Sequence, residues 1–303
     1  MSHDHAHAHS HAGDLRERRL LIAFALTACT LVAEAIGGWL SGSLALLADA
    51  GHMLVDAAAL LFAWLGAHYA RRPADARRSF GYVRLEVLVG YSNALIQFAL
   101  VAWIVVEALM RLSDPQPILS GTMFVVAVAG LLVNAFVLFV LSDHDHDDLN
   151  TASARLHVLG DLFGSVGAII AALLIRWLGW LWSDPVVSVL VSLLILASAW
   201  RLLRRSAHIL LEGAPEGIDA DLVSDALKRE ASGVRDVHHV HVWQLAGGYH
   251  VATLHANPED GVAHDHVIRS IQSVLLERFR IRHATVQIET QPCPNGDCGD
   301  AAH

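Results

Sequence analysis

The chain has 303 residues, of which 54% are hydrophobic and only 17% are charged. This composition is too apolar for an ordinary soluble protein and indicates a membrane protein. The net charge of −9, with no basic stripe along any predicted helix, excludes a nucleic acid as partner. Histidine is unusually abundant, with 20 residues, and therefore points to metal chemistry.

The first 14 residues are polar and rich in histidine, so we expect a disordered cytosolic tail. The segment lacks the basic and then apolar pattern of a cleavable signal peptide. Such a tail either binds metal weakly near a transport pathway or is a dispensable solvated extension. The sequence does not favour one of these interpretations over the other.

Residues 15–211 are predicted to form a transmembrane domain of six α-helices, because six apolar runs approach the roughly 20 residues that a bilayer requires. The expected spans are residues 20–40, 44–69, 83–112, 121–141, 152–177 and 186–210. Pro115 and Pro117 separate the third and fourth runs, and Pro185 lies just before the sixth.

The arginines predict the orientation of these spans in the membrane. They cluster before the first span, between the second and third spans, and at the end of the sixth, which are all on the same side if there are six. Because cytosolic loops carry the excess of arginine and lysine, both termini are expected in the cytosol. The predicted location is the cell (inner) membrane, as a multi-pass protein.

Two of the apolar runs carry a histidine and an aspartate four residues apart. His52 and Asp56 lie in the second span, and His157 and Asp161 lie in the fifth. A spacing of four places both side chains of a pair on one helix face. Two imidazoles and two carboxylates suffice for a closed tetrahedral zinc site. One pair alone could be an intrahelical hydrogen bond, but two pairs favour a divalent metal carried through the membrane.

Other ionisable residues in the spans are also functional candidates, since such groups are costly in a bilayer. Asp49 lies three residues before His52 on the same side of the helix, so we expect it to support the ligands rather than bind metal. Glu34 and Glu107 fit either proton relay or helix packing. His68 lies beside Arg71 near a helix end and is predicted to be interfacial.

Two other classes of function were compared with transport. An intramembrane zinc hydrolase needs an open coordination position and a general base, typically in a His-Glu-x-x-His motif, which is absent. The protein is therefore not expected to be an enzyme. A membrane-bound metal sensor with a cytosolic regulatory domain is the remaining alternative.

Residues 212–291 have the composition of a soluble cytosolic domain. Helical patterns occur at residues 220–230, with Asp219 as N-cap, and at residues 264–279. Strand patterns occur at residues 234–246, 249–256 and 284–289, with a hairpin signal at Gly247-Gly248. The expected fold is a small α+β domain with the order α-β-β-α-β and both helices on one face of the sheet. Residues 292–303 are expected to be a flexible tail.

Four motifs resemble the cation diffusion facilitator family, and most closely its bacterial zinc exporters with His-x3-Asp in the second helix. They are Ala-Asp-Ala-Gly-His52-Met-Leu-Val-Asp56, Arg-Arg-Ser-Phe-Gly-Tyr-Val-Arg84-Leu-Glu86, His157-Val-Leu-Gly-Asp161 and Val-Gln-Ile-Glu289-Thr-Gln-Pro-Cys293. The resemblance covers residues 16–293 and implies a homodimeric, proton-coupled antiporter. It implies that His52, Asp56, His157 and Asp161 bind the transported Zn2+. Cd2+, Co2+ and Ni2+ can use similar ligands, because affinity order alone does not enforce selectivity.

The resemblance also implies a metallochaperone-like cytosolic domain. In that domain, His238, His255 and Glu289 match a zinc site of the family, although several other histidines are nearby. Arg84 and Glu212 match a charge pair that fixes the dimer; the alternative is that Arg84 anchors lipid headgroups and Glu212 is solvated. Arg78 and Tyr82 stand where some members have loop histidines, so that loop metal site is expected to be missing.

Overall fold

The computed structural model describes residues 25–70, 75–142, 149–246 and 248–290. Side chains are described within these ranges except at residues 60, 63–70, 140–142 and 149–159. The predicted tails, residues 1–14 and 292–303, lie outside the described residues. By its internal contacts the chain divides into two compact units, residues 1–60 with 93–201 and residues 61–92 with 202–303.

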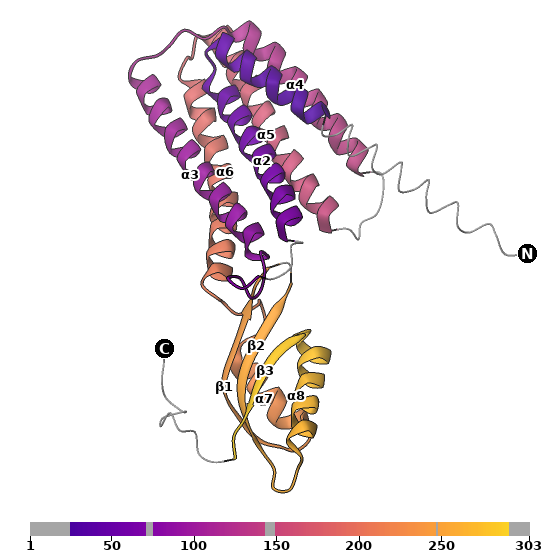
Figure 1. Ribbon diagram of the computed structural model, residues 1–303. Helices are drawn as coiled ribbons and strands as arrows, with labels where there is room; N and C mark the ends of the chain where they lie inside the picture. The colour runs from indigo at the N-terminus through magenta and orange to yellow at the C-terminus, as the bar shows by residue number, and fades with distance from the viewer. Residues whose placement is uncertain (1–24, 71–74, 143–148, 247, 291–303) are drawn as a thin grey trace, which may run out of the picture. The chain divides into compact units, whose positions relative to one another are not determined.

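Long helices occupy each of the apolar runs that the sequence indicates (Figure 1). They are Ala25–Ser41, α2 (Leu44–Ala70), α3 (Arg84–Ser113), α4 (Ser120–Ser142), α5 (Leu149–Leu178) and α6 (Ser183–Leu210). Within the described residues, α3, α4, α5 and α6 contain stretches that are long and apolar enough to cross a membrane. The predicted count of six spans remains a prediction, whereas the length and composition of these four helices support a multi-pass membrane protein.

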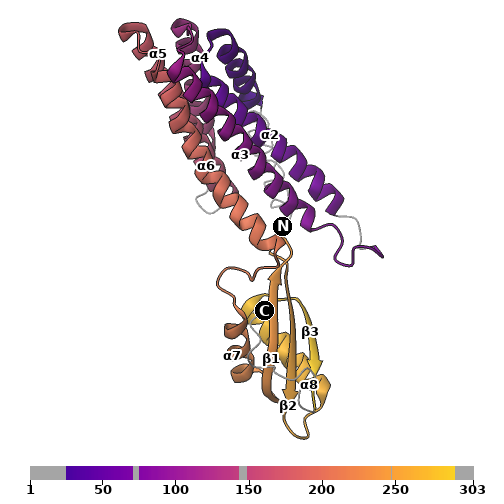
Figure 2. The same cartoon turned by 90° about the vertical axis from the view of Figure 1, so that its left-hand side faces the viewer.

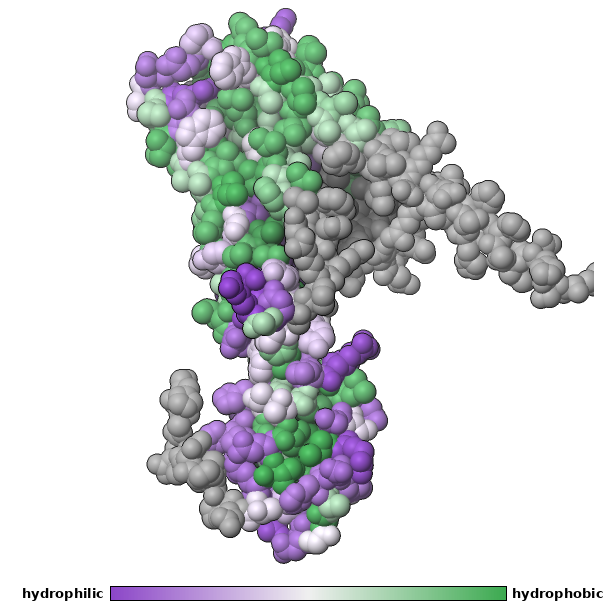
Figure 3. Space-filling model, viewed as in Figure 1, coloured by the Kyte–Doolittle hydropathy of each residue, from purple (hydrophilic) through white to green (hydrophobic). Residues whose placement is uncertain are grey.

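The surfaces of these helices explain why they suit a bilayer. Large apolar side chains point outward, including Trp39 at 81% exposed, Leu132 at 65% and Val125 at 66%. Figure 3 shows the resulting apolar cover on the visible face of the helical part. The buried positions are instead mostly small, such as Ala168 and Ala171, which allows close helix packing in the absence of a hydrophobic driving force.

The start of α2 is held by a carboxylate from another helix. Asp184, in the first turn of α6, is fully buried and accepts hydrogen bonds from Ser43 Oγ at 2.6 Å, Leu44 N at 2.7 Å and Ala45 N at 3.2 Å. The first turn of α2 has no acidic residue of its own. Asp184 therefore satisfies two of the backbone N–H groups that a helix start leaves without partners.

The remaining residues form the small α+β domain. Its elements are α7 (Ala220–Glu230), β1 (Val234–Gln244), β2 (His250–Pro258), α8 (His264–Phe279) and β3 (His283–Ile288). The strand order is β1-β2-β3, with β1 antiparallel and β3 parallel to β2. The two helices cover one face of the sheet (Figures 1 and 2) and share one apolar core with it, built on residues such as Leu227, Leu254 and Ile271.

The predicted order α-β-β-α-β and both helix ranges of this domain are confirmed. The predicted N-cap is also confirmed, since the Asp219 side chain accepts a hydrogen bond from Leu222 N at 2.7 Å. One detail was wrong: β3 ends at Ile288, so Glu289 follows the strand instead of lying on it. Its backbone still bonds to Ala256 O at 3.0 Å, which holds it beside β2.

We expect Asp184→Ala to destabilise the helical part, because it removes three hydrogen bonds to a buried carboxylate. Hydrogen bonds to charged groups contribute about 1.5–3 kcal/mol each, so a loss of roughly 3 kcal/mol or more is expected. Thermal unfolding of the purified protein in detergent measures this change. Asp114→Ala, at an exposed carboxylate between α3 and α4, is the control, and an equal loss in both variants would contradict the capping role.

Candidate functional site

The pair on α2 has the geometry that its spacing predicts. His52 Nε2 lies 3.6 Å from Asp56 Oδ2, one helical turn away. The two side chains are 14% and 23% exposed, so they are mostly buried but not sealed. An imidazole and a carboxylate therefore face a common space on one side of α2.

A residue of α3 completes this arrangement. Gln97 Nε2 donates a hydrogen bond to Asp56 Oδ1 at 2.6 Å, and Gln97 is only 4% exposed. Sequence reasoning missed this residue because it considered only ionisable groups in the spans. The sequence does contain a signal for it, because Gln97 is a polar amide in the middle of an otherwise apolar helix.

One close contact shows which residues of α2 lie level with which residues of α5. A side chain at Gly164 would begin 3.2–3.3 Å from the Asp49 carboxylate, so the two helices approach closely there. The helices run in opposite directions (Figure 1), and each residue advances 1.5 Å along its axis. Three residues on from Asp49 is His52, and three residues back from Gly164 is Asp161. These two residues consequently lie at one depth.

The same register pairs the other two predicted ligands. Seven residues on from Asp49 is Asp56, and seven residues back from Gly164 is 157, the position of the second histidine. Each histidine therefore lies level with an aspartate of the other helix. Asp161 is buried, at 3% exposed. The side chain of His157 lies outside the described residues.

Two further acidic side chains are buried in the same unit. Asp49, at 4% exposed, contacts α5 at Gly164, which fits the predicted supporting position. Glu34, at 1% exposed, packs against Gly130 of α4, where a Cβ would collide with the carboxylate and lie 3.5 Å from Ser165 Oγ. Glycine at position 130 therefore makes room for the Glu34 carboxyl group between the helices.

The soluble domain contains a second cluster of metal-type ligands. Glu289 Oε2 lies 3.0 Å from His238 Nε2, and Glu289 Oε1 lies 2.9 Å from His255 Nδ1. His238 and His255 are cross-strand neighbours on β1 and β2. One ligand atom from each of the three residues lies within 4.8 Å of the others. The structure thus brings together the three residues that the sequence analysis named.

The surroundings of this cluster suit a cation. Asp236 Oδ2 lies 3.3 Å from His238 Nδ1 and so turns Nε2 toward Glu289, as carboxylates do behind metal-bound histidines. His255 Nδ1 is buried and close to Glu289, yet it has no hydrogen bond of good geometry. Two imidazole nitrogens and a carboxylate that face one point form a fitting donor set for zinc.

The acidic groups of the cluster are ionised near neutral pH. Burial would raise the pKa of Glu289, but hydrogen bonds with Gln287 and His238 and the nearby His255 together lower the pKa below its ordinary value. For Asp236, burial also opposes ionisation, and the Lys228 ammonium outweighs it and lowers the pKa. A carboxylate with a lowered pKa is available as a metal ligand at neutral pH.

A third histidine lines the cluster without joining it. The His239 ring stacks on the His255 ring, with centroids 5.0 Å apart and planes 11° apart. The backbone of His239 has a φ of 49°, where the pairing of β1 with β2 shifts register. This irregularity places two consecutive histidines beside the same residue of β2.

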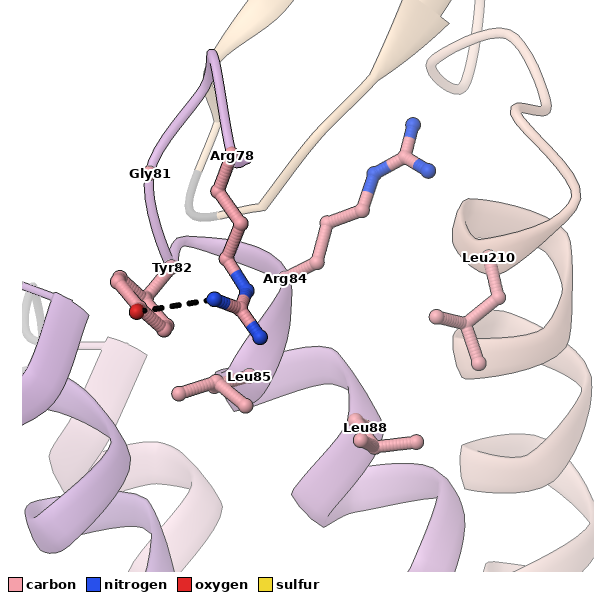
Figure 4. Close-up of a pocket in the computed structure, with 7 residues that line it drawn as sticks. All are labelled: Arg78, Gly81, Tyr82, Arg84, Leu85, Leu88 and Leu210. Carbon is pink, nitrogen blue, oxygen red and sulfur yellow. Dashed lines mark hydrogen bonds between the residues drawn. The ribbon is translucent and has the colours of Figure 1, made fainter. Parts of the chain in front are cut away.

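The predicted charge pair is formed within one chain. Arg84 Nη2 lies 3.0 Å from Glu212 Oε1, with side chains 36% and 63% exposed. Figure 4 shows Arg84 extending away from Leu85 and Leu88, which line the nearby pocket. Glu212 lies two residues after the end of α6, where Gly213 N bonds to His208 O at 2.8 Å and Glu212 N to Ile209 O at 3.2 Å. This is the Schellman pattern of a helix end.

The loop before α3 holds a separate polar network. Arg78 Nη1 donates a hydrogen bond to Tyr82 Oη at 3.0 Å, drawn in Figure 4, and its guanidinium lies 4.6 Å from the ring centroid. Tyr82 Oη bonds in turn to Asp75 Oδ2 at 3.1 Å. Hydrogen bonds from the backbone N–H of Arg77, with those from Tyr82 and Arg78, lower the pKa of Asp75 despite some burial.

Comparison with known proteins agrees with this two-part organisation. The family model described as the cation efflux transmembrane domain matches residues 20–211, and the cation efflux protein cytoplasmic domain matches residues 215–291. A solved structure, the metal-bound C-terminal domain of the CzcD transporter from Cuprividus metallidurans, is 27% identical. It covers 24% of this chain and 99% of that chain, with a TM-score of 0.22.

Whole-length relatives are more similar. The zinc transporter ZitB of Yersinia pestis is 50% identical over 94% of this chain and 92% of its own length. ZitB of Escherichia coli K12 is 49% identical over 98% of this chain and 96% of its own length. A cadmium, cobalt and zinc/H(+)-K(+) antiporter of Bacillus subtilis is 37% identical over 90% of this chain and 88% of its own length. This chain therefore belongs to the cation efflux family, the cation diffusion facilitators.

Proposed function

We propose that the protein exports Zn2+ from the cytosol through a four-ligand site made by His52, Asp56, His157 and Asp161. The observation that carries this proposal is the contact of Asp49 with Gly164, which gives α2 and α5 a common register. That register sets each histidine level with an aspartate of the other helix. Two imidazoles and two carboxylates match the ligand chemistry and coordination number of zinc.

The names of the relatives support the same substrate class. The two ZitB proteins are zinc transporters, and the Bacillus subtilis relative is named for cadmium and cobalt as well as zinc. Nitrogen and oxygen ligands alone do not enforce one metal, because affinity follows the general order of divalent ions. Zinc is thus the proposed main substrate, with Cd2+ and Co2+ as secondary substrates.

Proton exchange is proposed as the driving force. Zinc binds neutral imidazole and ionised carboxylate, so its binding displaces any protons that those groups hold. Because a histidine ring nitrogen binds either a proton or zinc, His52 and His157 are the proposed groups for exchange. Zinc released on the acidic side of the membrane is then replaced by protons, and zinc binding on the cytosolic side releases them.

The soluble domain is proposed to hold a second zinc ion through His238, His255 and Glu289. The ion would tie β1, β2 and the residue after β3 together and neutralise the Glu289 carboxylate. Because binding to the folded state alone stabilises that state, the domain would stiffen as cytosolic zinc rises. We propose that this domain regulates transport and contributes to a homodimer.

Removal of one transport carboxylate should abolish flux. Asp161→Ala leaves three ligands and an unbalanced buried charge, so we expect zinc uptake into proteoliposomes to fall by about 100-fold or more, as for loss of a well-placed charged ligand. The matched control is Asp114→Ala, which should transport normally. Normal flux through a folded Asp161→Ala protein would refute the site. If the wild-type protein binds zinc but does not transport it, the alternative function of a membrane-bound metal sensor would be favoured.

An imposed pH gradient should drive zinc movement in the proteoliposomes. With the compartment opposite the cytosolic face acidic, we expect zinc to accumulate there and protons to leave it, as reported by a trapped pH dye. The accumulation should disappear when an ionophore collapses the pH gradient. Zinc flux that ignores the gradient, with no proton movement, would contradict antiport.

The soluble domain should respond to zinc directly. We expect zinc to raise the unfolding temperature of a fragment of residues 212–303 by roughly 10–20 °C at 100 times its Kd, from about 2.7 kcal/mol of linkage. His255→Ala should lose most of this shift, whereas His241→Ala, at an exposed histidine of β1, should keep it. Should the fragment ignore zinc, the regulatory site is wrong.

A further inference from the structure

Gln97 is a buried polar residue of α3 whose amide is committed to one oxygen of Asp56. The Nε2 to Oδ1 distance of 2.6 Å is short even for a charge-assisted hydrogen bond. A carboxylate oxygen only accepts, so the NH2 end of the amide must face it. A buried amide in an apolar helix is costly unless it makes such a bond, so the contact determines the orientation of both groups.

The two oxygens of Asp56 consequently have different surroundings. Oδ1 accepts the hydrogen bond from α3, and Oδ2 is the oxygen near His52 Nε2, at 3.6 Å. A metal held by His52 and Asp56 therefore meets Oδ2, while Oδ1 is turned toward the amide. The carboxylate is presented for binding through one oxygen.

Coordination through one oxygen has a consequence for metal selection. Four single-atom ligands suit Zn2+, which is small and commonly tetrahedral in proteins. Larger divalent ions such as Cd2+ gain from more donors, which a carboxylate supplies when both of its oxygens bind. A hydrogen bond that occupies Oδ1 withholds this extra donor.

We propose that Gln97 is a specificity-determining positioning residue, which holds Asp56 as a one-oxygen ligand and so favours Zn2+ over Cd2+. The inference rests on the proposed transport site. It adds a residue that acts through Asp56 and touches the ligand rather than the ion. The geometry predicts the direction of the effect. Loss of the Gln97 amide should weaken the preference for zinc over cadmium.

The test compares Gln97→Met with the wild type for both metals. Methionine has nearly the same length and no hydrogen-bond donor, so it removes the bond and keeps the volume. In proteoliposomes, we expect the ratio of cadmium to zinc kcat/KM to rise about tenfold, the change that corresponds to one hydrogen bond to a charged group. The zinc KM should account for most of it, with kcat little changed.

Two further variants make the result specific. Gln97→Asn keeps an amide that is one methylene too short to reach Oδ1, and it should shift the ratio in the same direction. Asn93→Leu, one turn earlier on α3 and also buried, leaves the Gln97 bond in place and should keep the wild-type ratio. An unchanged ratio in both Gln97 variants, or an equal shift in Asn93→Leu, would overturn the proposal.

Binding measurements separate this inference from the proposed function. Calorimetry of the detergent-solubilised protein in a His255→Ala background gives the zinc and cadmium Kd without the cluster of the soluble domain. If the wild type binds both metals in detergent but moves neither across the proteoliposome membrane, the transport proposal fails, and the ratio of the two Kd values still tests Gln97. A Kd ratio that Gln97→Met and Gln97→Asn leave at the wild-type value would overturn the role of Gln97.

Discussion

The close approach of α2 and α5 at Asp49 and Gly164 is the constraint on which the proposed membrane site depends. Helices in lipid have no hydrophobic force between them, so they associate through small residues and polar contacts. A side chain larger than hydrogen at position 164 would have to displace the Asp49 carboxylate. The glycine therefore sets both the distance and the register at which α2 and α5 pass each other.

Two buried polar contacts in this unit follow the same logic, because a polar group that water does not reach is costly without a partner. Asp184 caps α2 from α6, and Gln97 bonds to Asp56 from α3. These contacts join segments that are 41 and 140 residues apart in the sequence. The polar side chains thus tie particular helices together, and small buried residues such as Ala168 and Ala171 let the helices pack closely.

The local part of this structure could be predicted from sequence, and the cross-helix part could not. Helix ranges, the Asp219 cap and the His-x3-Asp faces depend on residues near each other in the chain. The roles of Gln97 and Asp184 depend on which helices become neighbours, which periodicity does not specify. Gly160, Gly164 and Gly167 of α5 show the difference, because their spacing alone would suit any of them for close approach to another helix. Only Gly164 meets α2, since Gly167 faces Val187 of α6 and Gly160 has open space.

The end of α6 carries a residue that local stability does not explain. Glu212 has a φ of 62° at the position of a Schellman end where glycine is usual. For a residue with a Cβ this conformation costs about 1–2 kcal/mol. Its ion pair with Arg84 is partly exposed, and such pairs contribute about 0–1 kcal/mol. The two effects leave no net gain, so glycine would serve the helix end at least as well.

The value of Glu212 must therefore lie in position rather than in stability. The left-handed turn aims its carboxylate back at the first residue of α3, while the chain continues into the soluble domain. An ion pair with a partly solvated Arg84 is weak enough to open and close at little cost. The pair thus links the end of α6 to the start of α3 through a contact that solvent reaches.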